Sequence, residues 1–560
     1  MPITACLPPP NSPVADNAQA FCFWDGFLPL NDVVRTCALW RKTKSWPAPA
    51  IQSAGPRTQS ETLAIFESYP LNTLSGTAST ADPSIPLVVD LDGTLILTDM
   101  LHESALQLAR TRPATALQMP AWLAGGKAVL KKQISDRTRI DAASLPFNEP
   151  FLAWLREQKA TGRCLVLCTA SHASIAHDIA RHLGLFDQVM ASDGVLNLSG
   201  AYKADALVKT FGARGFDYAG NAGVDLAVWK VSRQAIVVNA SDTVAARARA
   251  LGNVAHEVPG IRGARRALLW LRAMRVHQWL KNMLLFVPLL AAHRLQDIDS
   301  LATLSVAFLA WGLCASSVYI ANDLLDLDSD RAHPRKRLRP FAAGTLSSLH
   351  GAIMVPILAA ASLYLGALMG PQFLAWMLVY LALTWAYSLS LKRIALLDCI
   401  TLACLYTLRI VAGSVAADLP LSFWLLACSA FLFLSLAFVK RYAELLVQQA
   451  AGKTRAHGRG YEVSDASMVQ SLGVAAGYTA VVVLALYLNS ATVLVMYDTP
   501  ELIWGAVPIM CFWVSRMWLC AARGQMHDDP LVFAFKDRAS LVAGALFCAV
   551  LMAASAHYPW

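Results

Sequence analysis

Residues 322–340 read Asn-Asp-Leu-Leu-Asp-Leu-Asp-Ser-Asp-Arg-Ala-His-Pro-Arg-Lys-Arg-Leu-Arg-Pro and directly follow an apolar run at 302–321. On a helix, Asp323, Asp326 and Asp330 would lie at i, i+3 and i+7 and would share one face. Carboxylates at the end of a membrane helix are costly to desolvate, so this alignment indicates a functional site. Three such oxygen donors suit Mg²⁺, which keeps several waters and bridges to substrate phosphates. The alternative is a solvated acidic helix end, balanced by the basic residues that follow.

The carboxyl-terminal half of the chain has the composition of a membrane protein. The 560 residues are 56% hydrophobic and only 15% charged, whereas about a quarter of the residues of a soluble chain are charged. From residue 277 onward, apolar runs long enough to cross a bilayer follow one another. This pattern predicts an all-α transmembrane bundle of about nine helices, with spans at 277–293, 302–321, 349–369, 372–391, 396–417, 421–439, 469–491, 501–521 and 539–556.

The positive charge of the chain is concentrated beside these apolar runs. The formal net charge is +9, and Lys and Arg gather in the loops after the second, fourth, sixth and eighth spans. This placement favours positive-inside topology and phosphate-bearing substrates over nucleic acid. It predicts a multi-pass protein of the inner (plasma) membrane, with the amino-terminal domain and the active sites cytoplasmic and Trp560 outside.

The motif Asn-Asp-x-x-Asp-x-x-x-Asp at residues 322–330 resembles the first aspartate-rich motif of the UbiA-type prenyltransferase superfamily, whose members hold a diphosphate through Mg²⁺. The continuation x-x-His-Pro-x-Lys-x-x-Arg-Pro is similar to one branch, decaprenyl-phosphate phosphoribosyltransferase, which makes the arabinose donor precursor of mycobacterial-type cell walls. Further segments resemble the same branch: Arg275 to Asn282, Tyr387 to Lys392, Asp398, Arg409 and Lys440 to Glu444. The basic loop around Lys440 and Arg459, without a second Asp-x-x-x-Asp motif, suits a donor that carries an extra 5-phosphate.

The resemblance implies Mg²⁺ on the donor pyrophosphate, bound by Asp323, Asp326 and Asp330 and oriented by Asn322. The predicted reaction transfers 5-phosphoribose from phosphoribosyl pyrophosphate, or uses another diphosphate donor, with a polyprenyl (decaprenyl) phosphate as the acceptor. Two alternatives stay open: an aromatic prenyltransferase of quinone biosynthesis, and a lipid-binding or transport scaffold with a regulatory soluble domain. The expected substrate-binding residues are Lys281, Lys336, Arg339, Tyr387, Lys392, Asp398, Arg409, Lys440 and Arg459.

Residues 84–258 have the pattern of a soluble α/β domain. Short apolar runs at 86–90, 164–168 and 235–239 are typical of buried parallel strands. A helical stretch at 99–144 is long for a simple crossover and predicts an inserted cap. Residues 1–83, rich in Pro, Ser, Thr and Ala, are expected to be disordered or a mis-assigned start, and residues 259–276 form a basic linker to the membrane domain at 277–560.

The sequence Asp90-Leu-Asp92-Gly-Thr resembles motif I of the haloacid dehalogenase superfamily, which implies a Rossmann-like fold with a helical cap. Asp90 would be the nucleophile and Asp92 the general acid and base. Thr169 and Lys203 match the phosphate-binding hydroxyl and lysine. Asp90, Asp92, Asn221 and Asp225 would form a second Mg²⁺ site, although Asn221 stands where the family carries Asp. Asn221 therefore leaves open whether this domain is an active phosphatase, which would then remove the 5-phosphate from the lipid product.

Overall fold

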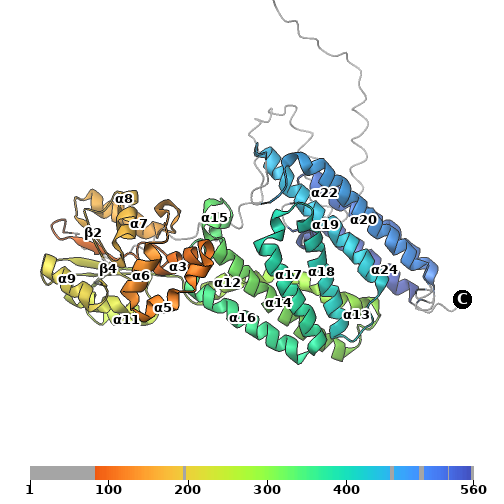
Figure 1. The fold of residues 1–560 in the computed structure, drawn as a ribbon, viewed down its shortest axis with the longest axis horizontal. Helices are drawn as coiled ribbons and strands as arrows, with labels where there is room; N and C mark the ends of the chain where they lie inside the picture. The colour runs from red at the N-terminus through yellow and green to blue at the C-terminus, as the bar shows by residue number, and fades with distance from the viewer. Residues whose placement is uncertain are drawn as a thin grey trace, which may run out of the picture. The chain divides into compact units, whose positions relative to one another are not determined.

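The computed structural model describes residues 82–192, 197–454, 459–490, 493, 497, 499–526 and 529–555. The expectation for residues 1–83 falls almost entirely outside these ranges. Within them, an α/β unit precedes a set of long helices, coloured orange to yellow and green to blue respectively in Figure 1.

A parallel sheet of six strands forms the centre of the α/β unit, in the order β3-β2-β1-β4-β5-β6. The sequence predicted three of these strands, and the structure confirms them as β1, β2 and β5. Because β1 lies between β2 and β4, the loops that leave these three strands meet at one edge of the sheet, where α/β folds place their ligands. The strands are β1 (Leu87–Val89), β2 (Leu165–His172), β3 (Gln188–Ser192), β4 (Asp217–Gly220), β5 (Ala235–Val238) and β6 (Val254–Val258).

Helices cover both faces of this sheet and bury two hydrophobic clusters. On one face, α7 (Glu149–Ala160) and α8 (Ala173–Leu183) pack Phe151 and Ile179 against the strands. On the other face, Leu207 and Trp229 pack inward from two further helices. The helices of that second face are α9 (Ala201–Phe211), α10 (Leu226–Val231) and α11 (Asp242–Arg249).

The expected cap lies between β1 and β2 and is helical. It has its own small core of Leu108, Leu130 and Ile134. Asp99 caps its first helix by accepting hydrogen bonds from the backbone N–H groups of Leu101 and His102. The cap helices are α3 (Met100–Thr111), α4 (Pro113–Ala116), α5 (Met119–Ala124) and α6 (Lys127–Ser135).

Among the described residues, seven helices are long and apolar enough to cross a membrane. An eighth crossing results if α23 (Pro530–Lys536) and α24 (Arg538–Ala554), bent by 82°, count as one span. The helix α12 (Gly263–Ala273) precedes the bundle. The seven are α14 (Ile298–Leu325), α16 (Ser348–Leu368), α17 (Pro371–Leu389), α18 (Leu397–Ala416), α19 (Phe423–Ala450), α20 (Ala466–Leu488) with η7 (Val463–Asp465), and α22 (Ala506–Ala522) with η8 (Pro500–Gly505).

The first expected span, 277–293, differs in form from the other eight. This segment is a 3-10 helix, η4 (Val276–Phe286), followed by the short α13 (Val287–Ala291), so it is no long α-helix. At about 2 Å per residue in η4 and 1.5 Å in α13, the two pieces together reach about 30 Å, close to the thickness of a hydrocarbon core. Arg275, before η4, pairs with Asp323 near the end of α14, whereas α13 leads into the start of α14. The segment therefore runs beside much of α14 in two pieces.

Gly413 lets η4 pack closely on α18. A Cβ atom on Gly413 would lie 2.1 Å from the backbone oxygen of Leu285. Backbone atoms cannot move aside as a side chain can, so this contact requires glycine.

We predict that Gly413→Ala lowers the stability of the detergent-solubilised protein by about 1–3 kcal/mol, because the added methyl group overpacks the contact between η4 and α18. Gly544→Ala on α24 is the matched control, since its Cβ would meet no atom within 4 Å. Thermal unfolding followed by circular dichroism measures both. Equal melting temperatures for the two variants would contradict the contact.

Candidate active sites

Polar side chains of the bundle gather at one end, where α14, α17 and α19 end. Asp326, at the end of α14, lies 3.9 Å from the Lys392 ammonium beyond α17. Arg459, beyond α19, donates a hydrogen bond of 3.3 Å to the Tyr387 hydroxyl near the end of α17. The loops that the sequence marked as basic therefore meet one another.

The acidic stretch does not continue as one helix. Leu325 ends α14, Asp326 lies at the break, and α15 (Leu327–Ala332) begins afterwards. Asp323 and Asp330 are buried, at 3% and 1% exposure, but the Asp326 side chain is 47% exposed. Hydrogen bonds from Asp326 N–H to the Asn322 carbonyl and from Asp330 N–H to the Asp326 carbonyl continue across this break, so Asp326 differs from the other two in exposure, and the shared face of the three carboxylates stays a prediction.

Two arginines hold the buried pair of carboxylates. Arg339 Nη1 donates to Asp330 Oδ2 at 2.6 Å and to Asp323 Oδ1 at 3.2 Å. Arg275 Nη2 donates to the same Asp323 oxygen at 2.5 Å. Asn322 points elsewhere, since its amide donates to Ser388 Oγ at 2.9 Å, and Lys336 lies exposed on η5 (Lys336–Leu338).

Asp330 leaves one oxygen for a further ligand. Its Oδ1 is buried and has no hydrogen-bond partner in the structure. Burial raises the pKa of Asp330, an effect that Arg339 opposes. In the part of the chain that the structure describes, no three His, Cys, Asp or Glu side chains converge on one point as metal ligands would. The oxygen donors present nevertheless fit Mg²⁺, and Asp323 and Asp330 are the residues that would hold it.

A second group forms around Asp529, a residue that the sequence reasoning missed. Lys281 and Lys440 donate to Asp529 Oδ2 at 2.8 and 2.9 Å. The Tyr406 hydroxyl lies 3.3 Å from Oδ1 of the same carboxylate. The signal in the sequence was an Asp-Pro pair at 529–530 before an apolar run, which is also typical of an ordinary helix start.

Arg409 is buried in α18, as its position in an apolar run predicted. Its guanidinium donates to Asn282 Oδ1 at 3.0 Å and to the Tyr380 hydroxyl at 3.0 Å, and it also bonds the Leu405 carbonyl. Within the described residues its partners are therefore neutral.

A third group surrounds Asp398, which is fully buried. Arg441 Nε lies 2.9 Å and Arg459 3.6 Å from Asp398 Oδ2, and the Tyr461 hydroxyl donates to Oδ1 at 2.6 Å. Glu444 pairs with both arginines. Opposite charges therefore surround Asp398, although Asp398 Oδ2 and Arg441 Nε and Nη2 make no hydrogen bond in the structure.

The α/β domain collects its expected site at the carboxyl edge of the sheet. Lys203 Nζ donates to Asp90 Oδ1 at 2.6 Å, and its other bonds reach the Cys168 carbonyl and the Tyr218 hydroxyl. Thr169 Oγ1 lies 3.4 Å from Asp92 Oδ2. Ser171, which the sequence reasoning did not assign, donates to that oxygen at 2.7 Å.

The third acidic position has a structural task. Asp225 Oδ2 accepts from the backbone N–H groups of Asn221 and Ala222 at 3.0 and 2.9 Å, and Oδ1 accepts from the Tyr218 hydroxyl at 2.8 Å. The Asn221 amide packs against Gly93, where a Cβ atom would lie 2.0 Å away. In this arrangement Asp225 shapes the loop that carries Asn221.

Negative charge is crowded around Asp90. Burial raises the pKa of Asp90 to about 7, an effect that Lys203 opposes and that Asp225 and Asp92 reinforce. Burial also raises the pKa of Asp92. This shortage of positive charge beside hard oxygen donors fits Mg²⁺, with Asp90 and Asp92 as the side chains that would hold it.

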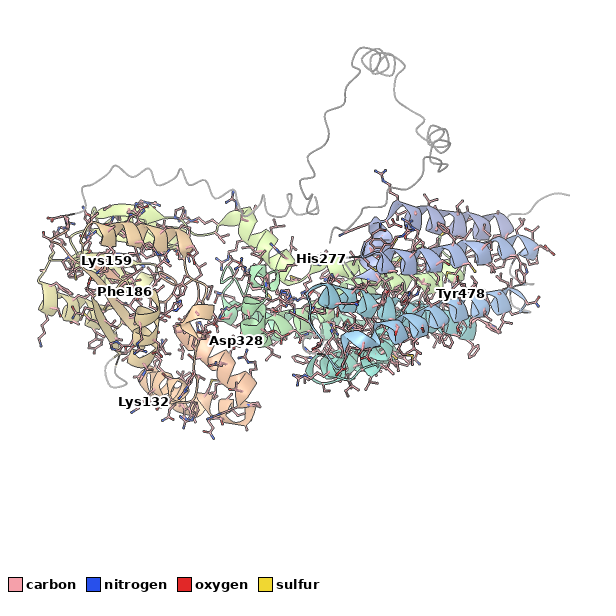
Figure 2. The ribbon with its side chains drawn as sticks, turned by 90° about the horizontal axis from the view of Figure 1, so that it is seen from above. Lys132, Lys159, Phe186, His277, Asp328 and Tyr478 are labelled. Carbon is pink, nitrogen blue, oxygen red and sulfur yellow. The ribbon has the colours of Figure 1, made fainter. Side chains whose placement is uncertain are left out.

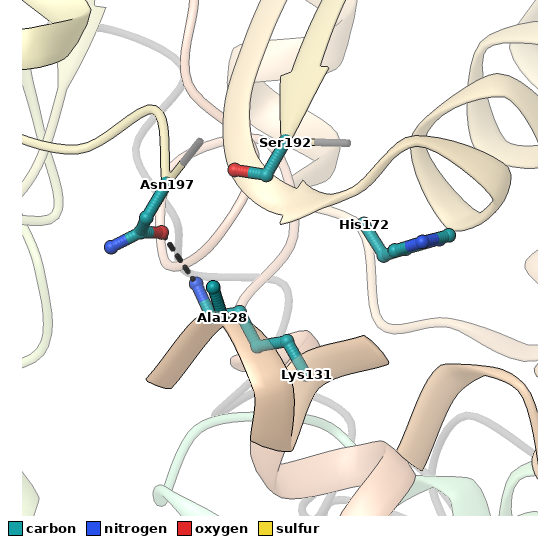
Figure 3. Close-up of a pocket in the computed structure, with 5 residues that line it drawn as sticks. All are labelled: Ala128, Lys131, His172, Ser192 and Asn197. Atoms are coloured by element: carbon teal, nitrogen blue, oxygen red, sulfur yellow. Dashed lines mark hydrogen bonds between the residues drawn. The ribbon is translucent and has the colours of Figure 1, made fainter. Parts of the chain in front are cut away.

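The cap contributes a lysine to the edge of this site. Figure 3 shows a pocket lined by Lys131 of α6, His172, Ser192 and Asn197. Lys131 Nζ donates to the Ala170 carbonyl at 2.8 Å and lies 3.4 Å from Asn197 Oδ1.

The cap also contacts the acidic stretch of the bundle. Arg331, next to Asp330, donates to both oxygens of Glu103 on α3 at 2.8 and 3.1 Å. This ion pair is buried, with side-chain exposures of 5% and 7%. A second pair joins Arg110 of α3 to Asp328, which is labelled in Figure 2.

Known proteins resemble the chain over both halves. The UbiA prenyltransferase family matches residues 283–538, and haloacid dehalogenase-like hydrolases match residues 87–222. Protein y4nM of Sinorhizobium fredii is 37% identical over 84% of this chain and 92% of its own length. Decaprenyl-phosphate phosphoribosyltransferase of Mycolicibacterium smegmatis is 35% identical over 48% of this chain and 86% of its own length. The chain belongs to the UbiA prenyltransferase family.

Other relatives of this UbiA-family enzyme cover about half of the chain. Nodulation protein NoeC of Azorhizobium caulinodans is 40% identical over 49% of this chain and 89% of its own length. A solved UbiA homolog from Archaeoglobus fulgidus, bound to GPP and Mg²⁺, is similar with a TM-score of 0.39 and 17% identity, over 51% of this chain and 99% of that chain. The family matches and the long apolar helices show that the protein is an integral membrane transferase with a haloacid dehalogenase-like domain, and both families generally depend on Mg²⁺.

We predict that Mg²⁺ binding at Asp90 weakens about tenfold between pH 8 and pH 6. A carboxyl group with a pKa of about 7 is mostly protonated at pH 6, and the proton competes with the cation. Calorimetric titration of the full chain measures this binding as the component that Asp90→Asn removes. A component of equal affinity at both pH values would show that the pKa of Asp90 lies well below 6.

Proposed function

We propose that the membrane half transfers 5-phosphoribose from phosphoribosyl pyrophosphate to a polyprenyl phosphate. The observation that carries this proposal is the pair of buried carboxylates, Asp323 and Asp330, held by Arg339 with one Asp330 oxygen unpartnered. Such a group suits a metal-bound diphosphate, and a carrier has little use for it. The phosphoribosyltransferases among the relatives support the choice of donor.

The chemistry needs positioning and charge neutralisation more than a base. An oxygen of the lipid phosphate, already ionised, attacks the anomeric carbon of the ribose while the bond to pyrophosphate breaks and pyrophosphate leaves. Mg²⁺, when bound, would neutralise charge on the leaving pyrophosphate. Arg275 and Arg339 place positive charge beside the same carboxylates. This charge can stabilise the negative charge that develops on the departing pyrophosphate oxygens.

We propose further that the haloacid dehalogenase-like domain removes the 5-phosphate from the lipid product. An oxygen of Asp90 would attack phosphorus, Asp92 would protonate the departing sugar oxygen, and water would then hydrolyse the phosphorylated Asp90. The contact between Glu103 and Arg331 supports this sequence, because it joins the cap to the acidic stretch. Tethering of this kind raises the effective concentration of the second site over the product. Both sites would face the cytoplasm, as the loop charges indicate, and the carboxyl terminus would lie outside.

The transfer is tested by incubating membranes that contain the protein with labelled phosphoribosyl pyrophosphate, polyprenyl phosphate and Mg²⁺. We expect the wild type to form a labelled lipid. Asp323→Asn and Asp330→Asn are each expected to lower its formation at least about tenfold, because each removes a carboxylate charge that would hold Mg²⁺ on the diphosphate. The same loss is expected for Asp326→Asn, the third carboxylate of the predicted site. A reaction with a prenyl diphosphate and 4-hydroxybenzoate, but none with the ribose donor, would identify an aromatic prenyltransferase instead.

The dephosphorylation is tested with Asp90→Asn, which removes the nucleophile and leaves the bundle unchanged. We expect this variant to accumulate the phosphorylated lipid, whereas the wild type releases inorganic phosphate and accumulates polyprenylphosphoryl ribose. Asp242→Asn, an exposed position on α11, is the control. If the wild type and Asp90→Asn accumulate the same phosphorylated lipid, the domain acts on another substrate or on none.

A further inference from the structure

The group around Asp529 carries more positive than negative charge. Lys281 and Lys440 both bond the same oxygen, Asp529 Oδ2. Each ammonium has three N–H donors, so a single shared oxygen leaves both lysines able to donate further hydrogen bonds. The Lys281 side chain is only 10% exposed, and Lys440 is 30% exposed. Two cations therefore share one carboxylate in an apolar bundle.

Arg409 adds a third cation beside Tyr406. The Tyr406 ring lies 5.6 Å from Lys281 Nζ and 5.8 Å from the Arg409 guanidinium carbon. Among the described residues, no carboxylate lies within ion-pair distance of Arg409, and Asp529 is the one such partner of Lys281 and of Lys440. Buried positive charge of this kind is unfavourable unless an anion offsets it.

Asn282 provides an independent sign of a missing partner. Its side chain is 1% exposed, and its Oδ1 accepts the hydrogen bond from Arg409. Its Nδ2 is buried without any hydrogen-bond partner. Buried donors are nearly always satisfied, so this amide indicates an acceptor that the protein chain itself does not supply.

The Asp529 group is distinct from the acidic stretch. Arg275 pairs with Asp323, and Lys281, six residues later, pairs with Asp529. A 3-10 helix rises about 2 Å per residue, so these two contacts lie about 12 Å apart along η4. The start of η4 thus lies beside a carboxylate pair that suits a cation, and its middle lies beside a group that suits an anion.

We propose that Lys281, Lys440, Arg409 and Asn282 bind the phosphate monoester of the lipid acceptor, and that Asp529 positions the two lysines. This inference rests on the proposed transfer reaction and divides its two substrates between the two groups. A dianionic phosphate would offset the excess charge and accept the free N–H groups. The ligand's apolar chain suits the surroundings, because Tyr406 packs on Phe433 in the largest apolar cluster of the bundle.

The first test separates the substrates kinetically. Lys281→Ala and Lys440→Ala are each expected to raise the KM for polyprenyl phosphate at least tenfold and to leave the KM for the ribose donor within twofold. Asp529→Asn should do the same, with Asp529→Glu partly restoring the acceptor KM, which a merely structural role would not predict. Arg523→Ala, an exposed cation beyond α22, is the control. A rise in the donor KM instead would overturn the assignment.

The second test needs no donor. Binding of a fluorescent polyprenyl phosphate to the purified full chain is expected to weaken at least tenfold in Lys440→Ala and to stay unchanged in Asp330→Asn. Lys440→Met, which keeps the aliphatic stem, replaces Lys440→Ala if that variant does not fold. Equal binding by wild type and lysine variants would refute the inference. Lysine-dependent binding without any transfer from phosphoribosyl pyrophosphate would support it and refute the proposed donor.

Discussion

Charge buried in an apolar bundle must be matched by opposite charge, and this constraint organises the membrane half. The Asp398 carboxylate and the Arg441 guanidinium are both fully buried, 2.9 Å apart, on neighbouring helices. Arg275 and Asp323 join η4 to α14 in the same way. Losing one member of such a pair leaves an uncompensated charge, so the pairs fix how the helix ends meet. The site is therefore built from the same contacts that hold that end of the bundle together.

Buried charge in the α/β domain is balanced at one place and unbalanced at another. Asp217 is fully buried but is matched by Arg163 and Arg233, so its charge is balanced within the protein. Asp90 pairs with Lys203 but has the carboxylates of Asp92 and Asp225 close by, and its pKa rises to about 7. Charge that is balanced within the protein indicates a structural role, whereas an excess of one sign indicates a place for a ligand. In the bundle, Asp398 is balanced by Arg441 and Arg459, whereas Lys281 and Lys440 share the single carboxylate of Asp529.

The sequence predicted the features that depend on local pattern. Apolar runs identified β1, β2, β5 and the long helices, and the spacing after β1 identified the cap. It did not predict the break at Asp326, because periodicity alone cannot show that a helix ends and a second one starts. Asp529 was missed because its partners, Lys281 and Lys440, lie 248 and 89 residues away. The role of Asp225 in its own loop likewise depends on Tyr218, which only the folded chain brings near.

The central claim is that Asp323 and Asp330 hold a divalent cation against the donor pyrophosphate. Mn²⁺ bound to the Asp90→Asn variant, which lacks the other predicted metal site, makes this directly measurable by electron–nuclear double resonance. With phosphoribosyl pyrophosphate present, the account predicts a ³¹P hyperfine coupling at the manganese that disappears in Asp90→Asn combined with Asp330→Asn. The same coupling in both proteins would show that the cation and the pyrophosphate meet somewhere else.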